Sequence, residues 1–538
     1  MAEPQYDLLI QGGRILDGTG SPWRRADLAV ADGEIAALGL NLPESSAREV
    51  LSAKDRYVAP GFVDAHSHAD LTQLSGERME YRLAQGITTE VVGQDGLSYA
   101  PASGPHLDEW SRYLIGLNGA FPDRIGWDWE TTGELLDRYE SRVSNTVFLI
   151  PHGAVRVEVM GWEARPADKN ELARMQDLVR QGLAEGGAGL STGLTYMPCA
   201  HAETEEMIAL CEPVGEAGGI LSVHLRSYAG QLLEAVGEAI KIGEATGAGV
   251  HISHLRMADR STWDMAERVL TKIDRARERG VDVTFDIYPY TVGCAPLFCL
   301  LPPRAQHGGP DAVLARLADP EQRELIRTEQ ESWMLDWWLY SLSNAAHPAY
   351  QGYEGRPLPE AAQAEGVSVP ELIMDVLRET ALDSTITAKG GREHANRIML
   401  QHPAGMIGSD GVLVGGRPHP RGFGTYPRLL ARYVRDNRLL RLEEAVWKMS
   451  AFPARRHRLE DRGVLTPGAA ADVVVFSLSD LEDRATYENA LQRPKGIDTV
   501  LVNGHPVIRD GVYRGGTSGR ALRPLAAGTA RPGKRSQR

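Results

Sequence analysis

Short strand-like apolar runs alternate with helical stretches through the middle of the chain, from about residue 59 to residue 464. One unit shows the pattern well, because Asp168 and Glu171 form a capping signature ahead of an amphipathic stretch and a new strand begins at Gly189. Such alternation is typical of a parallel sheet with crossover helices. About eight strands can be counted, which predicts a TIM-like (β/α)₈ barrel with catalytic residues at the carboxyl ends of its strands. The predicted strands lie near residues 62 and 90 and at residues 146–150, 189–191, 220–224, 249–254, 283–286 and 397–400.

Both ends of the chain have the pattern of short antiparallel strands. Asp32-Gly33 near the start and Asn503-Gly504 near the end are strong hairpin signals, because the central residues of such turns need positive φ. Neither group of strands is large enough to support a core alone. We therefore expect residues 1–58 and 465–513 to pair into one composite domain, a small β-sandwich built from both termini.

Two segments depart from the α/β pattern of residues 59–464. The stretch from about 296 to 359 is rich in proline and tryptophan, and we interpret it as an insertion over the barrel mouth. Residues 514–538 hold seven basic and no acidic residues. They are expected to form a flexible basic tail rather than a nucleic-acid-binding arm.

Composition narrows the class of partner. The 538 residues carry a formal net charge of -14, which disfavours binding to nucleic acid or to an anionic membrane. Four cysteines without a Cys-x-x-Cys pair exclude a disulfide framework and a four-thiolate zinc site, and they favour a reducing compartment. With no signal-peptide pattern and no long apolar span, we expect a cytoplasmic protein that acts on a small molecule. The sequence does not determine whether the chain forms a homo-oligomer.

Four histidines stand at the ends of predicted strands. His66 and His68 are two residues apart on one strand, so their imidazoles face the same way and can chelate a metal ion. His224, His254 and Asp410 follow three other predicted strands. Together these side chains supply the nitrogen and oxygen donors that suit Zn²⁺. The sequence therefore predicts a metal site for one or two zinc ions.

The decamer Ala59-Pro-Gly-Phe-Val-Asp-Ala-His-Ser-His68 is similar to the signature of the amidohydrolase superfamily. Further segments make the chain resemble the N-acyl-D-amino-acid deacylases, or D-aminoacylases: Gly86–Thr89, Ser191–Leu194, Ile252–His254, Asp286–Tyr290, Gly408–Gly411 and Arg417–Arg421. The resemblance runs in order from about residue 5 to residue 511. It implies a TIM-like barrel with a composite β-domain, a zinc site at the mouth, and hydrolysis of an amide on a D-amino acid.

The resemblance assigns roles to the histidines and to Asp410. His66, His68 and Asp410 match one half of the family's metal site, and His224 and His254 match the other; Asp410 would also act as the general base. Where the family usually has a cysteine ligand, this chain has Asp95. Asp95 is either a metal ligand in place of that cysteine, with altered metal affinity or number, or a turn residue before Gly96.

Three further residues are candidates for contacts with the substrate. Arg256 stands where the family often has a lysine, and Arg421 lies in the segment Arg417–Arg421. Either guanidinium group offers paired donors for the α-carboxylate of the substrate, although each is also compatible with an ion pair elsewhere. Tyr288 matches a family tyrosine near the scissile carbonyl and is a candidate donor to the developing oxyanion, with a packing role as the alternative.

The predicted activity is metal-dependent hydrolysis of the linear amide bond in N-acyl-D-amino acids. Bound Zn²⁺ lowers the pKa of water to about 7, and Asp410 would move the proton to the departing amine. One alternative is an amidohydrolase acting on a cyclic amide, an isopeptide or an amide-bonded toxin; a more distant one is a non-catalytic binding barrel. Against the hydantoinase type, residues 148–153 contain no lysine to bridge two metals. The acyl group, the preferred side chain and the pathway stay undetermined by the sequence.

Overall fold

Two parallel sheets occupy the middle of the protein. The computed structural model describes residues 4–122 and 125–524. One sheet has six strands in the order β17-β13-β12-β11-β10-β9, and the other has three in the order β6-β7-β8. The strands are β6 (Phe62–Asp64), β7 (Ile87–Val92), β8 (Asn145–Phe148), β9 (Ile150–Pro151), β10 (Gly189–Gly193), β11 (Ile220–His224), β12 (Gly249–Ile252), β13 (Val283–Ile287) and β17 (Gly405–Ile407).

Hydrogen bonds join the two parallel sheets at both edges. The amide of Leu149, between β8 and β9, donates to the carbonyl of Val92 at 3.0 Å. At the other edge the amide of Ala65 donates to the carbonyl of Ile407 at 3.3 Å, and Ser67 forms a parallel bridge with Gly411. The first and last parallel strands are therefore neighbours in space.

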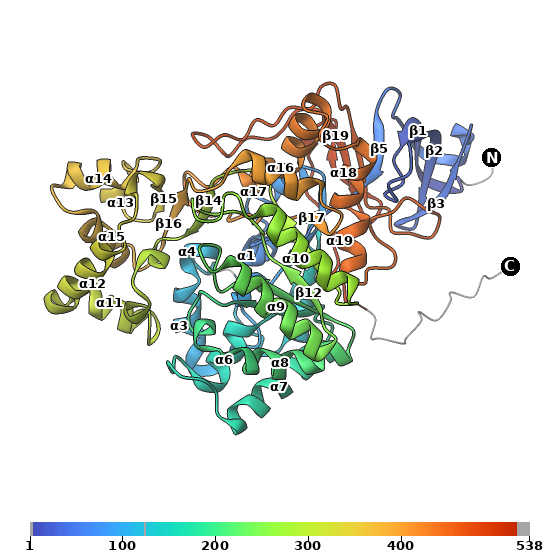
Figure 1. Ribbon diagram of the computed structural model, residues 1–538. Coiled ribbons are helices and arrows are strands. Elements are labelled where there is room, and N and C mark those ends of the chain that lie inside the picture. The colour runs from blue at the N-terminus through green and yellow to red at the C-terminus, as the bar shows by residue number, and fades with distance from the viewer. Residues whose placement is uncertain (1–3, 123–124, 525–538) are drawn as a thin grey trace.

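Helices cover the strands in the manner of crossover connections. The side chain of Asp168 accepts from the amide of Glu171 and completes the predicted capping box, and the helix that follows buries Met175 and Val179 against the sheet. In Figure 1 the helices α7 to α10 follow one another along one flank of the molecule. The helices of this part are α1 (Asp70–Ser75), α2 (Met79–Leu83), α3 (Leu107–Tyr113), α4 (Ile115–Asn118), α5 (Thr132–Arg138), α6 (His152–Met160), α7 (Lys169–Ala184), α8 (Thr204–Glu216), α9 (Leu232–Thr246), α10 (Ala266–Glu278), α16 (Glu393–Gln401), α17 (Arg421–Arg428), α18 (Leu442–Met449) and α19 (Ala451–Arg456).

The two ends of the chain share one sheet of nine strands. Its order is β21-β20-β19-β18-β5-β1-β2-β3, and β4 pairs with β1. The junction is antiparallel pairing of β5 with β18, in which Pro60 lies opposite Val473. Figure 1 shows the early and late strands side by side at the upper right. The strands are β1 (Tyr6–Ile15), β2 (Arg24–Ala31), β3 (Glu34–Gly39), β4 (Ala47–Ser52), β5 (Tyr57–Pro60), β18 (Val473–Phe476), β19 (Ile497–Val502), β20 (His505–Arg509) and β21 (Val512–Tyr513).

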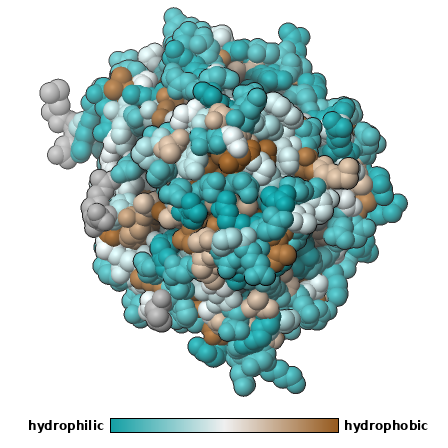
Figure 2. Space-filling model, turned by 90° about the vertical axis from the view of Figure 1, so that its left-hand side faces the viewer, coloured by the Kyte–Doolittle hydropathy of each residue, from teal (hydrophilic) through white to brown (hydrophobic). Residues whose placement is uncertain are grey.

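A lobe projects from the barrel region between β13 and β17, at the left of Figure 1. It contains a separate sheet of three strands and the helices α11 (Gly309–Ala318), α12 (Pro320–Ser332), α13 (Pro348–Gln351), α14 (Leu358–Glu365) and α15 (Val369–Glu379). The strands are β14 (Gly293–Pro296), β15 (Tyr340–Ala345) and β16 (Ser384–Ala388), so this excursion continues past residue 359. Figure 2 looks onto this side, which is largely hydrophilic with separate apolar patches. Leu325, Met334 and Trp338 are exposed on the lobe.

One predicted strand is wrong. Residues 397–400 belong to α16, and the last parallel strand is β17, at residues 405–407. The helix buries Ala395 and Met399, which are four residues apart, as well as Asn396 and Leu400. A short apolar run cannot by itself distinguish a buried strand from one face of a helix.

The chain beyond β21 packs against the barrel region as far as it is described. Gly519 donates its amide to the carbonyl of Arg142 at 2.7 Å, and Ala521 forms a bridge with Thr146 of β8. The remainder of the predicted flexible tail, residues 525–538, lies outside the described residues. In the described ranges, every helix is too short or too polar to cross a membrane.

Candidate metal centre

The carboxyl ends of the parallel strands bring the six predicted ligands to one place. His66 and His68 follow β6, and His224 is the last residue of β11. His254 and Asp410 follow β12 and β17 within a few residues. All of these side chains are buried except that of His224, which is partly exposed. Ends of adjacent parallel strands meet at one edge, which is why residues far apart in sequence meet here.

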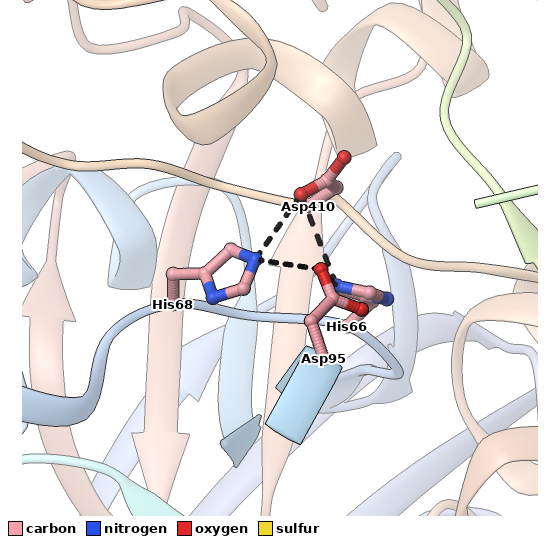
Figure 3. A group of neighbouring side chains, drawn as sticks. All are labelled: His66, His68, Asp95 and Asp410. Atoms are coloured by element: carbon pink, nitrogen blue, oxygen red, sulfur yellow. Dashed lines mark ion pairs between the residues drawn. The ribbon is translucent and has the colours of Figure 1, made fainter. Parts of the chain in front are cut away.

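Asp95 lies among the four histidines, and Figure 3 shows its carboxylate beside two of them, His66 and His68. It comes from a short turn, Gln94–Gly96, after β7. Its Oδ2 atom is nearly equidistant from one ring nitrogen of each histidine: 3.7 Å from His66 Nε2, 3.7 Å from His68 Nε2, 3.7 Å from His224 Nδ1 and 3.6 Å from His254 Nε2. Asp95 is thus a turn residue whose carboxylate also points into the cluster.

Asp410 lies beside the His66–His68 pair. Its Oδ1 atom is 3.3 Å from His68 Nε2 and 3.8 Å from His66 Nε2. The ligand atoms form two groups, each with all members within 4.8 Å of one another, and Asp95 belongs to both. One group is His66, His68, Asp95 and Asp410; the other is Asp95, His224 and His254.

These spacings fit a divalent cation. Zinc bonds of roughly 2.0–2.2 Å to nitrogen and oxygen place the ligand atoms of a tetrahedron about 3.3 Å apart. The contacts between an imidazole and a carboxylate or a second imidazole in the cluster range from 3.0 Å, between His224 Nδ1 and His254 Nε2, to 3.8 Å, and all ligand atoms of each group lie within 4.8 Å of one another. Within the described structure, the buried Nε2 of His66 and Oδ1 of Asp95 have no hydrogen-bond partner. Buried polar atoms are seldom left unpaired, and a metal ion would satisfy them.

The electrostatics of the cluster also favour a cation. Burial would raise the pKa of Asp95, but the imidazoles of His66 and His254 outweigh it and hold that pKa well below its usual value. For Asp410, burial again acts upward, and the charge of Arg421 and then that of His254 lower the pKa more. Burial lowers the pKa of His224 to about 4. Two carboxylates therefore stay ionised beside a neutral His224. Burial would lower the pKa of His66, but Asp95 and then Asp286 outweigh it and raise that pKa, so this imidazole holds a proton that a bound metal ion would displace.

Residues behind the ligands orient them. Asp286, on β13, places its Oδ2 atom 3.4 Å from His66 Nδ1 and 3.0 Å from His251 Nε2. This contact leaves His66 Nε2 directed at the cluster, as carboxylates behind metal-binding histidines commonly do. Tyr228 donates its hydroxyl to the carbonyl of Ser253 at 2.8 Å, and its ring packs on His224 with centroids 4.9 Å apart. Sequence reasoning missed both roles; the place of Asp286 on a parallel strand was the only signal.

Three of the six candidate ligand residues have a left-handed, strained backbone conformation. Asp95, His254 and Asp410 have φ values of 58°, 33° and 50°. Non-glycine residues in this region cost about 1–3 kcal/mol each and persist where the surrounding structure fixes them, often at functional sites.

A cavity of about 210 Å³ opens beside the cluster. Asp95, His224 and Asp410 line one side of it. Leu97, Leu117 and Val412 add apolar walls, and the start of the lobe contributes residues 294–296.

All three predicted substrate-binding residues line this cavity. Arg421 is buried at the start of α17 and forms an ion pair with Asp410, with 2.7 Å between Nη1 and Oδ2. Its guanidinium carbon lies 4.9 Å from the centre of the Tyr288 ring. The Nη1 atom of Arg256 is buried without a hydrogen-bond partner among the described residues. The bond between Arg421 and Asp410 was not predicted from the sequence.

Comparisons with known proteins identify relatives along almost the whole chain. Residues 49–508 match the model of the Amidohydrolase family. The chain is 33% identical to a D-aminoacylase of Alcaligenes xylosoxydans xylosoxydans over 529 residues, which cover 97% of this chain and 98% of that protein. It superposes with a TM-score of 0.83 on the crystal structure of N-acyl-D-glutamate deacylase from Bordetella bronchiseptica, a complex with zinc and a phosphonate mimic of the tetrahedral intermediate. There the identity is 33%, and the match covers 96% of this chain and 100% of that one.

A solved D-aminoacylase with a binuclear metal centre is also similar, with a TM-score of 0.80 and 32% identity over 96% of this chain and 99% of that one. Similarity at this level over the full length, together with the family match, shows the family to which the chain belongs. The chain belongs to the amidohydrolase family, in its D-aminoacylase branch.

Proposed function

We infer that this protein is a metal-dependent hydrolase that removes the acyl group from N-acyl-D-amino acids. The observation that carries the inference is a cavity of about 210 Å³ that presents the metal-ligand cluster and two arginines together. The cluster suits hydrolysis of an amide, and the arginines suit a substrate with a carboxylate. The names of the relatives, D-aminoacylase and N-acyl-D-glutamate deacylase, support the same substrate class.

We propose Zn²⁺ as the metal, held in one or two positions. His66, His68 and Asp410 would bind one ion, His224 and His254 the other, and Asp95 would bridge them, as its central Oδ2 atom indicates. When bound, zinc lowers the pKa of water to about 7 and polarises the amide carbonyl. The chemistry then depends on what the other groups of the chain do.

In this proposal Asp410 moves the proton. Its carboxylate takes a proton from the attacking water as the new carbon–oxygen bond forms, and delivers that proton to the amide nitrogen as the carbon–nitrogen bond breaks. Tyr288 donates its hydroxyl to the carbonyl oxygen as charge develops there. Arg421 and Arg256 hold the α-carboxylate and so orient the scissile bond. Correct orientation of a bound substrate accounts for a large part of the rate acceleration. The apolar wall beside them excludes bulk water.

We also propose the architecture that presents this site. The hydrogen bonds at both edges of the parallel sheets support a closed (β/α)₈ barrel over residues 59–464. Residues 1–58 and 465–513 would form the composite β-domain, whose shared sheet already contains strands from both ends. The lobe, proposed at about residues 296–359 with its sheet reaching Ala388, would narrow the barrel mouth.

A paired substrate screen tests the function. The zinc-loaded protein is assayed on N-acetyl-D-amino acids, their L-enantiomers, a set of cyclic imides and a set of isopeptides. We expect hydrolysis of D-substrates with little or none of the L-forms. Preferential opening of cyclic imides or cleavage of isopeptides would overturn the proposal in favour of another amidohydrolase reaction.

A further inference from the structure

Arg82 is fully buried and uses every N–H group of its guanidinium. The side chain comes from α2 and is 0% exposed. Its Nε and Nη2 atoms donate to the two carboxylate oxygens of Glu90 at 2.9 Å and 2.7 Å, and Nη2 also donates to Asp64. Its Nη1 atom donates to the hydroxyl of Ser409 at 3.1 Å and to the carbonyl of Gly422 at 2.8 Å. An arginine has five such donors in one plane, and all five are engaged.

The partners of Arg82 stand next to residues of the metal site. Ser409 precedes Asp410, Gly422 follows Arg421, and Asp64 lies two residues before His66. Asp64 reinforces the arrangement, since its Oδ1 atom accepts the amide of Ser409 at 2.7 Å and its Oδ2 atom accepts the Ser409 hydroxyl. The planar guanidinium group therefore contacts residues that lie one or two positions along the chain from His66, Asp410 and Arg421.

We propose that Arg82 is a positioning residue that sets the relative placement of Asp410 and Arg421. Asp410 has φ 50° and lies on a loop, so its side chain depends on the contacts that hold that loop. Arg421 meets it across only 2.7 Å, and small shifts of either backbone would change where the carboxylate lies against the metal and the water. Displacements on the order of 1 Å, caused by mutations distant from the chemistry, can cost about 10²-fold in rate.

Lysine cannot replace this arginine. An ammonium group has three donors about a single point, and it cannot reach Glu90, Ser409 and Gly422 along separate directions. It does keep a positive charge between Asp64 and Glu90, both 0% exposed, which would otherwise be left without their charged partner. Arg82→Lys is for that reason the perturbation that alters geometry while keeping the buried charge.

Arg462→Lys is the matched control. Arg462 is also buried, at 4% exposure, and its Nη1 atom donates to Asp472 and to Asn503, both at 2.6 Å. These partners flank β18 and β19 in the nine-stranded sheet, and none of them adjoins a residue of the metal site. Both variants exchange a buried, carboxylate-bonded arginine for lysine, so they share the general cost of that exchange.

The experiment compares the two variants as metal-loaded full-length proteins. Metal content, melting temperature, kcat and KM on an N-acetyl-D-amino acid are measured, together with the absorption spectrum of the Co²⁺-substituted forms. We expect Arg82→Lys to lower kcat by about 10²-fold per metal-loaded molecule, with a smaller change in KM, and to alter the Co²⁺ spectrum. Arg462→Lys should keep the wild-type kcat and spectrum even where its melting temperature falls. Equal losses of kcat in both variants, or a wild-type kcat per loaded Arg82→Lys molecule, would overturn the proposal.

Two further measurements guard the interpretation. Should Arg82→Lys fail to fold, Ser409→Ala removes one contact of Arg82 and the hydroxyl bond from Ser409 to Asp64, and it leaves every charge in place. About a tenfold loss of kcat is expected, and no loss would refute the positioning role. The losses from Arg82→Lys and Arg421→Lys should also be less than additive in the double variant, because both act on one arrangement. The kinetic readouts rest on the proposed function. If the wild-type protein hydrolyses none of the substrates, that function fails, whereas the Co²⁺ spectra still decide the role of Arg82.

Discussion

Replacing Arg421 by alanine separates two roles that the structure gives to one side chain. Arg421 is 1% exposed and bonds to Asp410 at 2.7 Å, and it also lines the cavity where we place the substrate carboxylate. The substitution therefore has a cost on every substrate, because Asp410 loses its charged partner. It has a second cost only on substrates that carry the anion.

The second cost can be isolated with a pair of substrates. A hydrogen bond to a charged group contributes about 1.5–3 kcal/mol, so the carboxylate substrate should lose roughly ten- to over a hundredfold in kcat/KM beyond what its carboxamide loses. The carboxamide reports the loss through Asp410 alone. When the two losses in kcat/KM are expressed as free energies, their difference is the contribution of the contact between Arg421 and the carboxylate.

Arg256→Ala serves as the internal comparison. Among the described residues, Arg256 forms no ion pair with Asp410, and its buried Nη1 atom is free to meet a ligand. We expect this variant to lose kcat/KM on the carboxylate substrate and to keep it on the carboxamide. The assay measures initial rates of the wild-type protein and both variants on an N-acyl-D-amino acid and its carboxamide. If Arg421→Ala loses equally on the two substrates, Arg421 acts only through Asp410 and is not a carboxylate clamp.

Three other predictions concern the metal ligands. Chelation should abolish hydrolysis and added Zn²⁺ should restore it, and full activity of the metal-free protein would contradict the mechanism. The His224→Ala and His254→Ala variants should each contain less metal by elemental analysis. Asp410→Asn should lower turnover by at least about 10²-fold while circular dichroism and metal content stay close to wild type, and near-native turnover would assign the proton transfer to another group. Asp95→Asn should reduce the metal stoichiometry, and Asp95→Cys should restore it with a sulfur-to-cobalt absorption band in the Co²⁺ form; unchanged stoichiometry in Asp95→Asn would exclude the bridging role.

The positions of the candidate ligands could be predicted because they follow from local patterns. His66 and His68 stand just after an apolar strand, and His224 is the last residue of another. In a parallel arrangement the ends of such strands converge, so identifying the strands is enough to place the imidazoles together. The same local reasoning gave a wrong element at residues 397–400, because a short apolar run does not show its period. The helical spacing appears only when Ala395 and Asn396 are seen to be buried with Met399 and Leu400.

Contacts between distant parts of the chain could not be predicted in the same way. Arg82 meets Ser409, 327 residues further along the chain, and Arg421 meets Asp410 rather than facing open solvent. Nothing in the residues around Arg82 marks it out from other arginines on short helices. Its role depends on which loops the fold brings over it, and that information is held in the tertiary structure.

The turn around Asp95 would allow the proposed ligand at this position to be exchanged while its place in the site is kept. Gly93 and Gly96 flank it with φ of 79° and 73°, and a Cβ atom at Gly93 would collide with the carbonyl oxygen of Leu149. At Gly96 a Cβ atom would lie 3.2 Å from Cys199 Sγ. The backbone is therefore held close to the neighbouring strands, and it directs any side chain at position 95 into the histidine cluster. The resemblance places a family cysteine at this position, and Asp95 would present a harder oxygen donor from the same point of the backbone. If Asp95 is a ligand, the cluster has only nitrogen and oxygen donors, so its preference should move away from thiophilic ions such as Cd²⁺ and toward Mn²⁺ and Co²⁺.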